Sequence, residues 1–443
     1  EGHKMKEVID SYKGEPGYPG VEDTGLLTEF RYEEVGWMED IILNDYSLVY
    51  SNLIKHDPNY PTPGDLWALT AVGNIEYESD YRFDTEGSDM IKEALLDNDQ
   101  RKLYIQLWGG ANTLARSLLS IEEEYRGKKK WNEIYQKVCK KAVIVAIGAQ
   151  DNAYQDYIST NWPEINYYDL GDIFGVYTAF GKSRVSEKYK YFYEGKWWRN
   201  NIKFGHGPIL NKYGLIGDGQ YYEGEGDNPN WQPGIAKNPD KFKYFNFFDG
   251  FKRYDWTSEG DSPAFLFLLN VGLKGLKEPG LGSWGGRLKA DDEKTSYYSV
   301  QADYNPELEK EDQFYSLSRW LEHIQRDFAA RADWCVQDYE SANHQPVVSV
   351  DSSDITAEAG ERITINGSAY DPDWDDLIYR WYQYQEAGSY IGKIKLNNTS
   401  GKSIDFIIPE DAEEGDTISL IFEVSDCGTP QLTRYQQVII RVK

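Results

Sequence analysis

The stretch from Lys102 to Arg116, KLYIQLWGGANTLAR, limits the possible folds more than any other, because it combines a short strand, a glycine turn and a helix start. Leu103 to Leu107 is apolar and aromatic, too short for a helix, and two glycines follow it closely. From Ala111 onward the apolar residues recur with a helical period. Ala142 to Ile147 is continuously apolar, which predicts a second strand buried on both faces. We therefore predict an α/β fold with an open, mostly parallel sheet and flanking helices.

This topology also predicts where a ligand binds. In open parallel sheets, ligands lie beyond the carboxyl ends of the strands. Here those ends are followed by residues 108–113 and 148–152. We therefore predict a site at these two turns, with Asn112 and Asp151 among the substrate-binding residues.

Composition excludes several classes of partner. The net charge of −27 argues against nucleic acid and anionic membrane surfaces, since both would repel the chain. No apolar run approaches the roughly 20 residues that cross a bilayer, so we predict no membrane insertion. The chain has 35 Tyr, 14 Trp and 17 Phe, which suits either stacking on sugar rings or ordinary core packing. Its three cysteines lie far apart and indicate neither a disulfide framework nor a metal site.

Two polar segments contain candidate functional residues. His56 and Asp57 stand beside a loop, where a His–Asp pair suits catalysis but is more often structural. Tyr191 to Gly207, YFYEGKWWRNNIKFGHG, concentrates aromatic rings and amides, a combination that suits a sugar. Trp198 and Asn201 are its substrate-binding candidates; a packed aromatic corner is an equal alternative. The long polar stretch 218–255 predicts a functional surface excursion.

A third candidate lies in TSEGDSPAFLFLLNVGL, where Glu259 and Asp261 precede Ser262, Pro263 and an apolar helical run. As structure, this is a helix with proline in its first turn. As chemistry, the two carboxylates are placed to bind a cation or to accept hydrogen bonds from sugar hydroxyls. Spacing alone does not separate these interpretations.

After residue 346 the pattern changes to short alternating runs separated by turn residues. These runs predict an all-β sandwich, and we expect an α/β domain over 1–343 and the sandwich over 346–443. The segment 371–381, DPDWDDLIYRW, resembles the DPDGD-then-strand motif of PKD and cadherin-like immunoglobulin-type modules. Its aspartates suit either calcium or an ordinary acidic turn. The predicted strands are VVSVD, ERITINGSAY, DLIYRWYQY, SIDFIIP, TISLIFEVSD and YQQVIIRV.

Several ordered motifs carry a family resemblance: KHDPNYP, GSDMI, LWGGANTLA, EGDSPAFL, WGGR, DFAARADWCV and ANHQP. Together they resemble the bacterial cellulose-binding, nucleoside hydrolase-like family over nearly the whole chain. The resemblance implies a nucleoside hydrolase-like domain followed by an immunoglobulin-like domain. It also implies a secreted, periplasmic or cell-surface protein associated with carbohydrate.

The same resemblance implies a calcium site. In nucleoside hydrolases a strand-end carbonyl before a Gly-rich turn and a late aspartate help to hold calcium, which positions the attacking water. Trp108 resembles the carbonyl position and Asp261 the late aspartate, while Asn201 is a weaker analogue of the hydroxyl-binding amides. However, Gly260 stands where those enzymes have histidine, and no aspartate cluster precedes Lys102. We therefore expect the first strand, which carries the general base and most metal ligands, to lie upstream of this chain, with that N-terminal segment as a partner.

Two functions follow from these observations. The first is binding of a polysaccharide such as cellulose, or of an oligosaccharide, without strong catalysis. The alternative is calcium-dependent hydrolysis of a glycosidic N- or O-bond. The absent histidine favours the first function, while Asp261 and the Gly-Gly turn favour the second.

Overall fold

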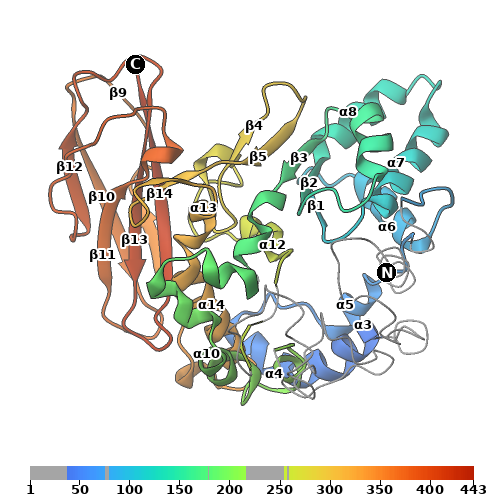
Figure 1. Ribbon diagram of the computed structural model, residues 1–443, viewed down its shortest axis with the longest axis horizontal. Helices are drawn as coiled ribbons and strands as arrows, with labels where there is room; N and C mark the ends of the chain where they lie inside the picture. The colour runs from blue at the N-terminus through green and yellow to red at the C-terminus, as the bar shows by residue number, and fades with distance from the viewer. Residues whose placement is uncertain (1–36, 75–78, 178, 216–253, 257–258) are drawn as a thin grey trace. The chain divides into compact units, whose positions relative to one another are not determined.

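The computed structural model describes residues 37–74, 79–177, 179–215, 254–256 and 259–443 (Figure 1). The chain forms two compact units. The first comprises residues up to 54, 59–264 and 290–299, and the second comprises 55–58, 265–289 and 300–443. The second unit therefore contains more than the predicted sandwich. That the chain separates near residues 343–346 stays a prediction, which limited proteolysis tests.

A mostly parallel sheet organises the first unit. Its strand order is β1-β2-β3-β5-β4, and β1, β2, β3 and β5 pair in parallel. β2 is buried along its whole length, as its apolar run predicts. The α/β prediction is confirmed. The strands are β1 (Leu103–Leu107), β2 (Ala142–Ala146), β3 (Asn166–Asp169), β4 (Leu288–Ala290) and β5 (Tyr297–Val300).

Figure 1 shows α6 (Glu86–Leu96), α7 (Asn112–Tyr125) and α8 (Trp131–Lys141) beside this sheet. Thr62 caps α5 by accepting a hydrogen bond from the Asp65 amide. α6 begins earlier than its apolar run indicates, because Thr85 and Ser88 form a capping box. The helices are α3 (Trp37–Glu39), η1 (Asp40–Tyr46), α4 (Ser47–His56), α5 (Pro63–Ala68), α6 (Glu86–Leu96), α7 (Asn112–Tyr125) and α8 (Trp131–Lys141).

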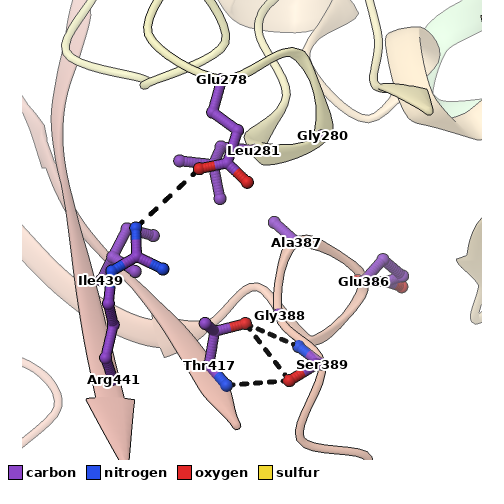
Figure 2. A pocket seen from close by; sticks show the side chains of 10 residues that line it. All are labelled: Glu278, Gly280, Leu281, Glu386, Ala387, Gly388, Ser389, Thr417, Ile439 and Arg441. Carbon is purple, nitrogen blue, oxygen red and sulfur yellow. Dashed lines mark hydrogen bonds and ion pairs between the residues drawn. The ribbon is translucent and has the colours of Figure 1, made fainter. Parts of the chain in front are cut away.

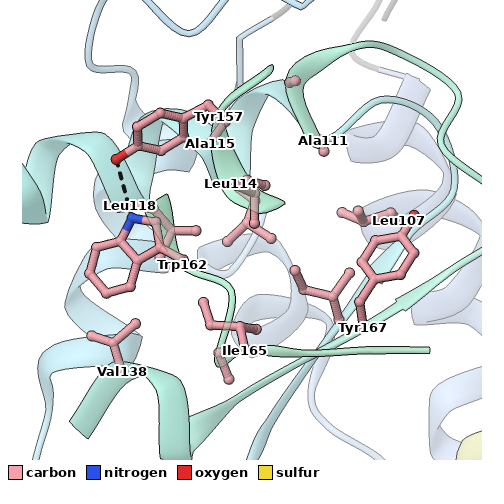
Figure 3. Packing of buried hydrophobic residues seen from close by; sticks show 14 of the residues in the cluster. Leu107, Ala111, Leu114, Ala115, Leu118, Val138, Tyr157, Trp162, Ile165 and Tyr167 are labelled. Atoms are coloured by element: carbon pink, nitrogen blue, oxygen red, sulfur yellow. Dashed lines mark hydrogen bonds between the residues drawn. The ribbon is translucent and has the colours of Figure 1, made fainter. Parts of the chain in front are cut away.

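The core of the first unit lies between the sheet and α7 (Figure 3). Leu114 and Leu118 of α7 are almost fully buried there. The Trp162 indole N–H donates to the Tyr157 hydroxyl oxygen at 3.2 Å, and that hydroxyl donates to Glu122 at 2.7 Å. The polar atoms of Trp162, Tyr157 and Glu122 are thus paired with one another inside this apolar core.

Short helical turns make up most of the described chain between β3 and the second unit. Pro263 lies in the first turn of α12, as predicted. Most of the predicted excursion, 218–253, lies outside the described residues. The elements are η2 (Tyr154–Ile158), α9 (Ser159–Asn161), η3 (Gly171–Val176), η4 (Ala179–Ser183), η5 (Glu187–Tyr193), α10 (Gly195–Trp198), η6 (Arg199–Lys203), α11 (Pro208–Asn211) and α12 (Ser262–Leu268).

The second unit contains a β-sandwich of two sheets, with strand orders β12-β10-β8 and β11-β13-β14-β9. The six predicted strands are confirmed. β9 was not predicted because it is short and half polar; it pairs in parallel with β14. The strands are β8 (Val347–Val350), β9 (Asp354–Ala357), β10 (Arg362–Tyr370), β11 (Ile378–Gln383), β12 (Ser403–Ile407), β13 (Thr417–Ser425) and β14 (Thr433–Val442).

Shorter elements complete the second unit. The sequence predicts a long amphipathic helix over 319–339, and the structure has α14 within that range, with ends two and five residues inside it. Within the described ranges, every helix is too short or too polar to cross a membrane. The elements are η10 (Pro279–Leu281), β6 (Asp303–Asn305), β7 (Lys310–Asp312), α13 (Tyr315–Ser318), α14 (Leu321–Trp334), η11 (Tyr339–Ser341) and η12 (Gln385–Ala387).

Candidate functional site

Asp151 links the turns that follow β1 and β2. Its side chain is buried, and its Oδ1 accepts hydrogen bonds from the Ala111 amide at 3.0 Å and the Ala153 amide at 3.1 Å. The two predicted turns therefore lie side by side at the carboxyl edge of the sheet. The contacts of Asp151 give it the role of holding this edge together.

Asn112 is a buried residue at the same carboxyl edge of the sheet, and its side chain forms a hydrogen bond to a neighbouring loop. Its side-chain amide donates to the Asn74 carbonyl at 2.5 Å, and the Asn74 side chain donates to the Phe83 carbonyl at 2.8 Å. Asn112 is only 6% exposed. The structure thus gives Asn112 the task of fixing the loop before α6, rather than of facing a ligand.

Trp108 and Asp261 are the predicted residues that face outward here. The Trp108 side chain is 49% exposed, and its indole N–H donates to Gln106 at 3.2 Å. Asp261 accepts a hydrogen bond at 3.1 Å from Gln150, whose amide also donates to the Ile147 carbonyl at 3.3 Å. Asp261 is therefore tied to the turn after β2 by Gln150, a residue that the sequence did not single out.

Glu259 lies just before Asp261 and is largely enclosed. It accepts a hydrogen bond from the Ser262 hydroxyl and is hydrogen-bonded to Tyr213. Burial raises the pKa of the Glu259 carboxyl, and the charge of Asp261 raises it further. The two carboxyl groups thus differ in environment, one enclosed and one bound to an amide.

The described residues do not by themselves form a calcium site. Within the described ranges, no three His, Cys, Asp or Glu side chains stand close enough together to hold a metal ion. One Asp261 oxygen is already engaged by Gln150. Calcium needs about six to eight oxygen ligands. Ligation by Asp261 and the Trp108 carbonyl stays a prediction.

Asp169, at the end of β3, is a further edge residue that the sequence did not identify. Its carboxylate accepts hydrogen bonds from the Gly148 amide at 3.2 Å, the Gly171 amide at 2.8 Å and the Tyr297 hydroxyl. The Tyr297 ring also stacks on Tyr167, with centroids 5.2 Å apart. Asp169 therefore fixes the glycine turn after β2. The sequence signal that could have identified Asp169 is its position at the end of a strand, two residues before Gly171.

Trp198 belongs to a buried group of rings in the 191–207 segment. It stacks on Trp256 at 4.8 Å and on Tyr213 at 5.1 Å, and its N–H donates to the Phe192 carbonyl at 2.6 Å. We call Trp198, Trp256 and Tyr213 the aromatic cluster. Trp198 is 0% exposed and has no face for a sugar. The structure thus favours the packed-corner alternative for this residue.

Asn201 is half-buried and bonds within its own helix. Its side-chain amide donates to the Trp197 carbonyl at 2.8 Å. No hydrogen bond among the described residues joins Asn201 to Asp151, Asp261 or Trp108. Its role in binding hydroxyl groups stays a prediction.

A hollow of about 410 Å³ opens next to Asn201 in the sequence, and four described residues line it: Arg199, Asn200, Phe204 and Tyr254. We call it the aromatic hollow. The rings of Phe204 and Tyr254 meet edge to face, with centroids 5.7 Å apart. The Arg199 guanidinium carbon lies 5.7 Å from the Tyr254 centroid and 6.0 Å from that of Phe204. Phe204 is 42% exposed. Asn200 is one of the amides that the sequence indicated in this segment, and Tyr254 lies in the predicted excursion 218–255, but Arg199 and Phe204 were not singled out.

A smaller hollow of about 220 Å³ lies in the second unit (Figure 2). On its wall the amides and hydroxyls of Ser389 and Thr417 bond to one another, and Arg441 lies 3.9 Å from Glu278. None of the described residues that line it is aromatic. It therefore offers polar groups but no ring on which a sugar could stack.

His56 does not pair with Asp57 in the described contacts. One ring nitrogen lies 2.9 Å from the His344 ring and the other lies 2.9 Å from the Gln337 carbonyl oxygen. The His344 ring in turn lies 2.9 Å from Asp373. These contacts fit the structural alternative for His56.

Two family models match this chain. Residues 23–288 match the family model described as cellulose-binding Sde182, nucleoside hydrolase-like domain, which is more than half of the chain. The chain belongs to this family. Residues 362–442 also match the model described as cellulose-binding protein Sde0182, C-terminal domain.

Among solved structures, this family member is similar to a nucleoside hydrolase-related hypothetical protein from Saccharophagus degradans that is associated with carbohydrate metabolism. The two share 26% identity over 92% of this chain and 88% of that chain, with a TM-score of 0.67. The human CEP192 ASH/PapD-like domain (14% identity, 22% and 84% covered, TM-score 0.16) and mouse PcdhgC3 EC1-3 (18%, 24% and 36%, 0.15) match too weakly to support a conclusion. No curated protein matches.

Proposed function

We propose that the protein binds a neutral glucan such as cellulose, or oligosaccharides of it, in the aromatic hollow and without strong catalysis. The observation that carries this proposal is the composition of the hollow, where two aromatic rings stand beside an amide and a guanidinium group. A pyranose ring has apolar faces and a rim of hydroxyl groups. Rings can cover its faces while Asn200 and Arg199 bond to its rim.

Size and charge agree with such a ligand. The volume of about 410 Å³ lies within the range of about 300–1,000 Å³ that small-molecule sites occupy. A neutral polymer is not repelled by a chain whose net charge is −27, whereas an acidic polysaccharide is. The cellulose-binding description of both matching family models supports the same ligand class.

Calorimetry with cellohexaose tests this proposal. Phe204→Ala should weaken binding about tenfold or more, as expected for loss of the ~1.5–3 kcal/mol gained by burying such a ring. Phe83→Ala is a matched control, because Phe83 is 70% exposed and also has an arginine, Arg82, 5.6 Å from its ring centroid. The control should bind like the unchanged protein. Equal affinities of the two variants would refute the proposed site.

We propose hydrolysis of a glycosidic bond as a second candidate function, because Glu259 and Asp261 form a carboxyl pair of unequal environment. A carboxyl group with a raised pKa suits proton donation to a leaving group. Turnover of nucleosides and cello-oligosaccharides, with and without calcium, tests this function. Glu259→Gln and Asp261→Ala should each remove turnover if it exists. Absence of turnover in the intact protein would leave binding as the function.

We further propose that the protein acts outside the cytoplasm, being secreted, periplasmic or at the cell surface, and that its sandwich is an immunoglobulin-like module of the PKD or cadherin type. A polymer such as cellulose is too large to enter a cell, which supports the location. Fractionation of the native producing cells tests it, and recovery of the protein only in the cytoplasm would contradict it.

A further inference from the structure

The turn between β10 and β11, in the second unit, presents Trp374 to solvent. This side chain is 93% exposed. Among the described residues, none stacks on its indole ring. Tyr370 and Ile378, at the two ends of the turn, are 63% and 53% exposed. A single exposed apolar side chain is ordinary, but the backbone conformation beneath this one is not.

The backbone at Trp374 is in the left-handed region, with a φ of +68°. Bulky L-residues rarely adopt this conformation, while glycine adopts it freely. A tryptophan at this position therefore destabilises the turn relative to glycine. It also recovers little by burial, since almost all of its side chain remains in water.

Two aspartates hold the turn from its inner side. Asp371 is buried, and its Oδ1 accepts hydrogen bonds from the amides of Asp373 at 2.9 Å and Asp375 at 3.2 Å. The Asp373 carboxylate accepts a hydrogen bond from the His344 amide at 2.6 Å and lies 2.9 Å from its ring. The turn is thus fixed while the ring stays open. A turn whose backbone is already fixed loses less entropy when a ligand covers it.

We infer that Trp374 stacks on a pyranose ring of a neutral glucan and gives the chain a second sugar contact, separate from the aromatic hollow. This inference rests on the proposed function. The flat apolar face of the indole matches the face of the sugar ring. Asp375 and Asp376, beside it, accept hydrogen bonds from hydroxyl groups but repel acidic sugars. Insoluble cellulose presents many glucan chains side by side. A second binding contact therefore raises the apparent affinity of the protein for cellulose, even though the affinity of the aromatic hollow is unchanged.

Depletion isotherms of the full chain on insoluble cellulose, together with thermal unfolding, test this inference. Trp374→Gly should unfold at the same or a higher temperature, because glycine relaxes the backbone, yet bind cellulose at least fivefold more weakly. A merely structural tryptophan would change these two quantities together. Ile391→Ala is the control, because Ile391 is 88% exposed in the same unit, and it should bind normally.

The outcomes separate the two proposals. Normal binding by Trp374→Gly, or an equal loss in Ile391→Ala, would overturn the inference. A loss in Trp374→Gly while Phe204→Ala binds normally would support it and refute the hollow as the site. A greater loss of cellulose affinity in the variant that combines Trp374→Gly and Phe204→Ala than in either single variant would support both contacts.

Discussion

The aromatic cluster and the aromatic hollow are adjacent in the chain but opposite in exposure. Trp198, the last residue of α10, is 0% exposed, whereas Phe204, which follows η6, is 42% exposed. In the cluster the ring faces are covered by other rings of the protein. In the hollow the Phe204 ring is partly exposed, and it lies beside Asn200 and the Arg199 guanidinium group. The difference teaches that exposure, rather than the abundance of aromatic residues, decides which rings can bind a sugar.

The largest effect should come from the cluster. Trp198→Ala should lower the free energy of unfolding by about 3–5 kcal/mol, since a buried indole leaves a large cavity. Urea denaturation measures this change. Trp67→Ala, on a residue that is 37% exposed, should cost far less. A loss below about 1 kcal/mol for Trp198→Ala would mean that the cluster is not a core.

Lys203 is a buried charged residue that bonds to a member of the aromatic cluster, Tyr213. It is 1% exposed, and its ammonium group donates to the carbonyls of Asn211 and Tyr213. Lys203→Met removes these donors and should cost roughly 1–3 kcal/mol, the penalty of a buried unpaired acceptor. Lys196→Met changes an exposed lysine nearby and should leave urea denaturation unchanged. Equal urea midpoints for Lys203→Met and Lys196→Met would contradict a stabilising role of the Lys203 hydrogen bonds.

The pH dependence of stability should report on Glu259, which contacts the cluster through Tyr213. Because burial raises the pKa of Glu259, the folded protein holds this proton more tightly than the unfolded chain. The free energy of unfolding should therefore fall as the pH rises above the ordinary pKa of 4.5 toward the folded value. Glu259→Gln should remove this part of the slope and exposed Glu194→Gln should not, as urea titrations across this pH range will show. Identical slopes in both variants would contradict the assignment.

The smallest effect on stability should come from the hollow. Phe204→Ala should change the free energy of unfolding by no more than about 0.5 kcal/mol, as is usual for an exposed residue. Urea denaturation measures it, beside calorimetry of the same preparation. A loss comparable to that of Trp198→Ala would show that Phe204 is a packing residue and would remove the contrast.

The elements that the sequence predicted best are those with a strong apolar period. The run at β2 and the alternating strands of the sandwich specify their own burial. The helix start at Pro263 could also be predicted, because the preference of proline for the first turn of a helix acts locally.

Side-chain exposure could not be predicted in the same way. Trp198 and Asn201 were chosen for their residue types, but packing against Trp256, which is distant in sequence, buries Trp198. Asn201 lies in the π-helix η6, and its side chain bonds to the Trp197 carbonyl, which its residue type did not predict. Gln150 and Asp169 were missed because their hydrogen bonds join segments that are distant in sequence and meet only in the folded chain.

The central claim is that the aromatic hollow binds the glucan, and hydroxyl-radical footprinting with mass spectrometry tests it most directly. With saturating cellohexaose, oxidation of Phe204 and Tyr254 should fall severalfold, while oxidation of the exposed control Phe83 should stay constant. Equal oxidation of Phe204 and Tyr254 with and without the sugar, under conditions where calorimetry shows binding, would contradict the claim.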